Sequence, residues 1–194
     1  MDLMQWRRKR EARIGVVLIH MQPAFVQNIG ADEANRMVEA QCEVLEVCVS
    51  KDYPVVKLEL RDLPGLHHYF GETLEKLSEI IGRAPRNASF KNYGSNGYNS
   101  VVESQFNEWE VNTFCLMGVE LPYCVINTAK GVVRGRKDII TARSLIAAEQ
   151  YDPKVEESLK WFRHNGKYFE DHADLLNLMR REPRVNLQIN EPSY

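Results

Sequence analysis

A cysteine stands where an apolar strand is expected to turn into a helix, and this position favours nucleophilic chemistry. Pro122 is typical of the first turn of a helix, which places Cys124 in that same turn. A helix N-terminus carries partial positive charge and free backbone N–H groups, which favour a thiolate and can hold an oxyanion. The alternative is a small buried core cysteine, and sequence position alone leaves both interpretations open.

Further candidates are the side chains that follow the other expected strands, because open parallel sheets bind ligands beyond the carboxyl ends of their strands. These residues are His20, Arg61, Asp62, Lys91, the turn from Gly118 to Cys124, and Arg143. Phe25 and Tyr123 are expected to line a pocket at this edge, as aromatic walls do in small-ligand sites. Glu120 is expected to cap the following helix. Arg61 and Arg143 are expected to be surface ion-pair partners.

The elements that must position these residues alternate between apolar runs and amphipathic stretches. Strands are expected at Ile14 to Ile19, Tyr53 to Leu60, Arg86 to Phe90, Thr113 to Gly118, Lys137 to Thr141 and Lys167 to Phe169. Helices are expected at Ala31 to Ser50, Glu72 to Ile81, Val101 to Trp109, Pro122 to Arg134, Pro153 to Arg163 and Asp171 to Arg180. This order predicts an α/β fold: three α/β/α layers around a mostly parallel sheet of about six strands, with right-handed crossovers.

The length of 194 residues fits one domain with a sizeable core. We expect a basic N-terminal arm at residues 1–13, the α/β domain at 14–182, and a C-terminal tail at 183–194. The arm holds a cluster of basic residues, Arg7, Arg8, Lys9, Arg10 and Arg13, and no apolar segment long enough for a signal or a membrane span follows it.

Charge and cysteine usage exclude several partner classes. A net charge of -2 gives no one-sided basic surface for a phosphate backbone, so neither nucleic acid nor membrane is expected as a partner. The four cysteines form no CxxC pair, which predicts no structural metal and a reducing, cytoplasmic location. Cys42, Cys48 and Cys115 are expected to be core or near-core residues.

Three segments together resemble the isochorismatase-like cysteine hydrolases. In the first, an apolar strand ends at His20, and Met21, Gln22, two more residues and Phe25 follow. In the second, Lys91 is followed four residues later by Ser95. The third contains Gly118, Val119, Cys124, Val125, Thr128 and Ala129. The resemblance covers about Ile14 to Phe169 and departs from the family pattern at His20, where the family has Asp.

The resemblance implies a fold, a triad and a reaction. Carried over by position, Cys124 is the nucleophile, Lys91 the cation, and His20 stands at the base position. The family's oxyanion hole implies a cis peptide between Val119 and Glu120, with the backbone N–H groups of Glu120 and Cys124 as donors. A small-molecule substrate, a homo-oligomer (dimer or tetramer) and no cofactor are also implied.

The histidine at position 20 leaves two interpretations open. Imidazole is a competent base for a thiol, and the Lys91 ammonium would help keep it neutral. On this interpretation the chain is a cysteine hydrolase that cleaves the C–N bond of a small amide. Alternatively, the missing carboxylate leaves Lys91 unpaired and the thiol unactivated, and the chain is a catalytically inactive binding or scaffold module.

Two further activities of the family are less favoured. Members that cleave the vinyl ether of isochorismate usually keep the Asp and lack the cysteine, which is the reverse of this sequence. Nicotinamidases hold a metal with an Asp-x-His pair and a further His. Asp62, His67 and His68 lie in the corresponding region without that spacing, so no metal site is expected.

Overall fold

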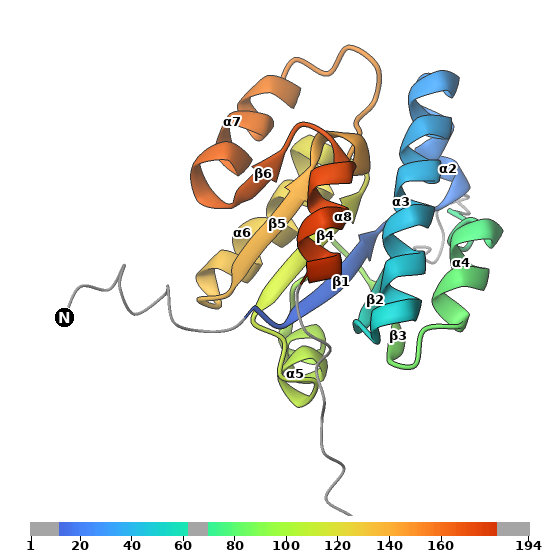
Figure 1. The fold of residues 1–194 in the computed structure, drawn as a ribbon. Helices are drawn as coiled ribbons and strands as arrows, with labels where there is room; N and C mark the ends of the chain where they lie inside the picture. The colour runs from blue at the N-terminus through green and yellow to red at the C-terminus, as the bar shows by residue number, and fades with distance from the viewer. Residues whose placement is uncertain (1–11, 62–69, 182–194) are drawn as a thin grey trace, which may run out of the picture.

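The computed structural model describes residues 12–61 and 70–181. Within them, six strands form one parallel sheet in the order β3-β2-β1-β4-β5-β6 (Figure 1). The strands are β1 (Ile14–Ile19), β2 (Val55–Leu60), β3 (Asn87–Asn92), β4 (Thr113–Gly118), β5 (Asp138–Ala142) and β6 (Lys167–Phe169). The predicted parallel α/β architecture is therefore confirmed.

Helices cover both faces of this sheet. They are α2 (Pro23–Val26), α3 (Ala31–Lys51), α4 (Glu75–Gly82), α5 (Ser100–Glu108), α6 (Ile126–Arg134), α7 (Val155–Asn165) and α8 (His172–Arg181). A π-helical turn, η1 (Leu121–Val125), leads directly into α6, and a 3-10 turn, η2 (Arg143–Leu145), follows β5. The sequence pattern did not predict α2 or the π-helical geometry of η1.

Two apolar cores hold the layers together. Side chains of α3, α4 and α8 pack on one face of the sheet, and those of α5, α6 and α7 pack on the other. In Figure 1, α3 and α8 cross in front of the strands and α6 lies behind them. Every residue of β1 and β4 is buried, which explains why these central strands are continuous apolar runs in the sequence.

Strand β3 extends two residues beyond its predicted end. Arg86 to Phe90 was the expected strand, but Lys91 and Asn92 also pair with β2, opposite Glu59 and Leu60. Pairing along an existing strand thus overrides the local preference of Lys-Asn-Tyr-Gly for a loop. Because successive side chains of a strand point to opposite faces, Lys91 and Asn92 leave the sheet on different sides.

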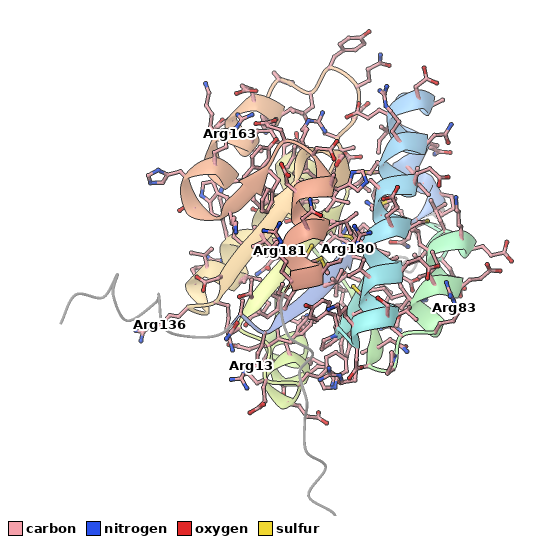
Figure 2. The ribbon with its side chains drawn as sticks, viewed as in Figure 1. Arg13, Arg83, Arg136, Arg163, Arg180 and Arg181 are labelled. Atoms are coloured by element: carbon pink, nitrogen blue, oxygen red, sulfur yellow. The ribbon has the colours of Figure 1, made fainter. Side chains whose placement is uncertain are left out.

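Charged side chains are spread around the outside of the domain. Figure 2 labels arginines from several separate elements. Arg13 pairs with Glu110 at 2.7 Å, Arg83 pairs with Glu46, and Arg163 bridges two glutamates. No helix in residues 12–61 and 70–181 is long and apolar enough to cross a membrane.

Three of the four cysteines belong to the apolar core. Cys42, Cys48 and Cys115 are buried, as predicted, whereas Cys124 is only half-buried. In the described part of the chain, no group of three or more His, Cys, Asp or Glu side chains is arranged to hold a metal ion. Most of the predicted N-terminal arm and the whole predicted tail, residues 1–11 and 183–194, lie outside the described residues.

Candidate functional site

Cys124 lies at the carboxyl edge of the sheet, in the turn between β4 and α6. The backbone N–H of Glu120 donates a hydrogen bond to the Cys124 sulfur. Burial nevertheless raises the pKa of this thiol to about 11, and the nearby Glu120 carboxylate adds to the increase. The predicted helix-start position is present, but the expected low thiol pKa is not, because burial of the sulfur outweighs the single backbone donor.

The turn that carries the cysteine contains a cis peptide between Val119 and Glu120, as the family resemblance implied. The Glu120 side chain has a different role from the predicted helix cap. Its carboxylate accepts a hydrogen bond from the backbone N–H of Glu149 at 2.8 Å. It makes no capping hydrogen bond to η1, the helical turn that follows it. Glu120 therefore ties the cysteine turn to the loop that follows η2.

His20 directly follows β1 and is fully buried. Its backbone has a φ of 49°, in the left-handed region that His, Asn and Asp enter more readily than other side chains. The imidazole stacks on Phe25 with ring centroids 5.8 Å apart, and Phe25 stacks on Phe70 at 5.1 Å. Burial lowers the pKa of His20, and a hydrogen bond to Asn92 partly opposes this effect. The ring is therefore held neutral.

Asn92 is a site residue that the sequence analysis missed. It is buried at the end of β3, and its Oδ1 lies 3.0 Å from His20 Nε2. The sequence contains a signal for it: Asn92 follows Lys91 directly, and successive side chains of a strand point to opposite faces of the sheet. The sequence pattern ends this strand at Phe90 and places Lys91 and Asn92 in a loop, where no alternation is expected.

Lys91 is not brought to His20. Its side chain is exposed, on the face of β3 opposite to that of Asn92, and it makes no hydrogen bond or ion pair within residues 12–61 and 70–181. The expected ammonium beside the imidazole is therefore absent from this geometry. His20 is neutral because it is buried, not because a cation lies next to it.

The loop after β3 links the His20 side of the site to the cysteine helix. Ser95 Oγ accepts a hydrogen bond from Asn127 Nδ2 at 2.8 Å. The backbone N–H of Gly97 donates to Thr128 Oγ1 at 2.9 Å. Asn127 and Thr128 lie on α6, less than two turns beyond Cys124. These two bonds join the loop that follows Asn92 to the helix that follows Cys124, and His20, Asn92 and Cys124 each come at or just after the carboxyl end of a strand, β1, β3 and β4.

The two predicted pocket residues differ in position. Phe25 is half-buried and lies against His20, where it can form a wall of the site. Tyr123 has 43% of its surface exposed, and the Lys154 ammonium lies 5.0 Å from its ring centroid. Phe25 is therefore part of the imidazole environment, whereas Tyr123 lies on the outer surface of the turn.

The remaining candidates lie away from the thiol or outside the described residues. Arg143 pairs with Glu33 at 2.9 Å, which confirms its predicted surface ion pair. Arg61 instead lies over the ring of Tyr93, at 5.3 Å. The possible metal ligands Asp62, His67 and His68 fall within residues 62–69, which are not described.

Comparison with known proteins gives structural matches only. No protein-family model and no curated protein matches this sequence. The MAR1 ribonuclease of Caenorhabditis elegans superposes with a TM-score of 0.72 at 14% identity, covering 86% of this chain and 81% of that one. A cysteine hydrolase from Pseudomonas syringae pv. phaseolicola gives 0.72 at 16%, covering 88% and 94%. N-carbamoylsarcosine amidase from Thermoplasma acidophilum gives 0.67 at 18%, covering 81% and 95%.

These identities are too low to transfer an activity, but the superpositions extend over most of each chain. The parallel six-stranded sheet and its flanking helices therefore have the isochorismatase-like hydrolase fold.

Proposed function

We propose that this chain is an isochorismatase-family cysteine hydrolase that cleaves the C–N bond of a small amide, with Cys124 as nucleophile and His20 as base. One observation carries the proposal: the backbone N–H of Glu120 donates to the Cys124 sulfur. A backbone donor at the nucleophile lies close to where negative charge develops in acyl transfer. The fold shared with N-carbamoylsarcosine amidase adds support by analogy.

The charges of the two side chains suit proton transfer during attack. Burial raises the pKa of the Cys124 thiol to about 11 and lowers the pKa of His20. A thiol and a neutral imidazole are thus the forms present before substrate binds. These charges suit a mechanism in which neutral His20 removes the thiol proton during attack, rather than one that starts from a thiolate–imidazolium ion pair.

The reaction then follows the general course of cysteine hydrolysis. As the Cys124 sulfur bonds to the amide carbonyl carbon, its proton passes to His20 and the carbonyl oxygen becomes an oxyanion. The backbone N–H groups of Glu120 and Cys124 stabilise that charge. Collapse of the intermediate breaks the C–N bond, and the imidazolium proton leaves with the amine. Water, deprotonated by His20, hydrolyses the thioester and restores the thiol.

Ammonia release from small amides tests this proposal. The full chain and a Cys124→Ser variant would be incubated with nicotinamide and with an N-carbamoyl amino acid. Matched circular dichroism spectra would show that both are folded. We expect turnover by the wild-type chain and at least a hundredfold loss in Cys124→Ser, since a hydroxyl is less acidic and less nucleophilic than the thiol that His20 would deprotonate. Equal release by both proteins would reject Cys124 as the nucleophile.

A catalytically inactive binding module is the second candidate function. It is favoured by the neutral, high-pKa thiol and by the exposed position of Lys91, which leaves no cation beside the imidazole in the described part of the site. A His20→Asp variant would distinguish the two functions, because Asp restores the residue that the family has at this position. Activity in His20→Asp but not in the wild type would establish the inactive module.

A further inference from the structure

Asn92 makes two side-chain contacts that together fix which atom of the amide faces His20. Its Nδ2 donates to the carbonyl oxygen of Gly94, and its Oδ1 faces His20 Nε2 at 3.0 Å. A backbone carbonyl can only accept a hydrogen bond, so the NH₂ group must be the one directed to Gly94. The oxygen is therefore left for the imidazole.

This orientation determines the tautomer of His20. An amide oxygen is an acceptor, so Nε2 must carry the hydrogen and donate it to Asn92. In a neutral ring the other nitrogen, Nδ1, then holds the free lone pair. Nδ1 is buried and has no hydrogen-bond partner among the described residues. A buried acceptor without a partner is uncommon and points to a functional role.

The surroundings hold the ring in this position. The imidazole stacks on Phe25, and its backbone adopts the left-handed conformation at the end of β1. Within the described chain, burial and the Asn92 hydrogen bond are the influences on the His20 charge, and no charged side chain contributes. The arrangement is therefore a neutral His–Asn pair, whereas the resemblance implied a base at position 20 beside the Lys91 ammonium.

We infer that Asn92 is the positioning residue of His20: it holds the ring in the Nε2–H tautomer and so presents Nδ1 as the base. The catalytic meaning of this inference rests on the proposed function, whereas the tautomer does not. The resulting Cys124, His20 and Asn92 set has the same residue types as the Cys-His-Asn sites of papain-like proteases, which arise on an unrelated fold.

The proton path follows from this assignment. The thiol proton moves from the Cys124 sulfur to Nδ1, and the imidazolium then carries hydrogens on both nitrogens. The Nδ1 hydrogen leaves with the amine, while the Nε2 hydrogen stays bonded to Nε2 and hydrogen-bonded to Asn92 Oδ1 throughout. Asn92 therefore never exchanges a proton, and it stabilises the imidazolium through the hydrogen bond it accepts.

Nitrogen NMR of the histidine-labelled full chain tests the tautomer without any substrate. We expect His20 to show a protonated Nε2 and an unprotonated Nδ1 at neutral pH. In Asn92→Leu, the hydrogen bond that raises the His20 pKa is lost, so the pKa should fall further and the Nε2–H signal should exchange faster. Asn92→Asp retains an acceptor and should restore the Nε2–H signal with a higher His20 pKa.

Asn127→Leu is the matched control. It removes the bond to Ser95 in the same loop but touches neither His20 nor Asn92, so the His20 signals should remain as in the wild type. In the amide assay, Asn92→Leu should lower kcat by about tenfold or more at an unchanged KM, and Asn92→Asp should recover part of that loss.

Two results would overturn the inference: a wild-type His20 protonated at Nδ1, or His20 signals in Asn92→Leu that match the wild type. The wild-type spectrum decides the tautomer even if Asn92→Leu does not fold. If the spectra are as expected and no amide is cleaved, the positioning role stands and the hydrolase proposal alone fails.

Discussion

The backbone N–H of Glu120 points at the sulfur of Cys124, yet the thiol is held in its neutral form. Burial of the sulfur raises its pKa to about 11, and one backbone donor does not compensate. The Glu120 carboxylate, itself half-buried, also disfavours the thiolate. Proximity to a helix start is therefore not sufficient to activate this cysteine, and a base is required at the moment of attack.

Alkylation kinetics provide the first prediction. Iodoacetamide should label Cys124 in the folded chain at least about tenfold more slowly at pH 8 than a free thiol, and the rate should continue to rise towards pH 11. Mass spectrometry of the labelled peptide measures the rate at this residue. The same peptide in urea-unfolded protein supplies the free-thiol reference. Rapid labelling at pH 7 would mean that the sulfur is a thiolate after all.

The second prediction concerns the pH dependence of stability. His20 has a folded-state pKa below its ordinary value of 6.5, so the unfolded chain binds more protons as pH falls below 6.5. The free energy of unfolding should therefore decrease between pH 7.5 and 5.5, and His20→Gln should flatten this slope. Urea titrations at several pH values measure it. A slope that persists in full in His20→Gln would assign the effect to other groups.

Gly118 gives a third prediction, because it occupies a conformation that side chains rarely adopt. Its φ is 132°, and a Cβ atom there would lie 2.1 Å from the carbonyl oxygen of Ile19. Gly118→Ala should thus cost more than about 3 kcal/mol of unfolding free energy, since backbone of two central strands must separate. Gly94→Ala, where nothing lies within 4 Å, is the control and should change stability little. A mild effect at Gly118 would contradict the close approach of β1 and β4.

Some of this architecture was predictable because it depends on local sequence. β1, β4 and β6 begin and end where their apolar or extended patterns predicted, and burial explains the runs in β1 and β4. Asp171 was the predicted cap of α8, and its Oδ1 accepts from the backbone N–H of Ala173 at 2.7 Å. Such features depend on residues that are close in sequence, so a single sequence is enough to predict them.

The pairing of His20 with Asn92 was not predictable in the same way. The two residues are 72 positions apart, and they meet only because β3 continues along β2 for two residues beyond its expected end. In this longer strand Asn92 points towards His20, so the preceding residue, Lys91, points to the other face of the sheet. The family resemblance had implied that Lys91 belongs to the site. Motif spacing identified the segment correctly, but the register of one edge strand decided which side chain entered the site.

Lys91 gives a fourth prediction. Because its side chain is exposed and unpaired among the described residues, Lys91→Met should change the unfolding free energy by less than about 0.5 kcal/mol. The His20 NMR titration should also remain as in the wild type, since no Lys91 charge contributes to it. Asn92→Leu, one residue further, serves as the contrasting variant. A His20 pKa that rises in Lys91→Met would place the ammonium beside the ring.

Gln22 gives the last prediction, because its buried amide joins the two sides of the connection between β2 and α4. Its Oε1 accepts from the Leu60 N–H at 2.7 Å, and its Nε2 donates to the carbonyl oxygens of Leu60 at 3.1 Å and Gly71 at 2.6 Å. These bonds fix Gly71 next to the end of β2, and so support its neighbour Phe70 in its stack on Phe25, which in turn stacks on His20.

Gln22→Ala should therefore cost about 2–4 kcal/mol in unfolding free energy, because it leaves partly buried backbone groups of Leu60 and Gly71 without this partner. Gln22→Glu is the sharper variant. It keeps the acceptor for Leu60 N–H but turns a carboxylate oxygen toward two carbonyl oxygens, which raises the pKa of the new carboxyl. A raised folded-state pKa stabilises the protonated form, so Gln22→Glu should approach wild-type stability as pH falls from 7 towards 5. Urea unfolding at both pH values measures this recovery, and a Gln22→Glu deficit that stays constant with pH would show that Nε2 does not face those carbonyls.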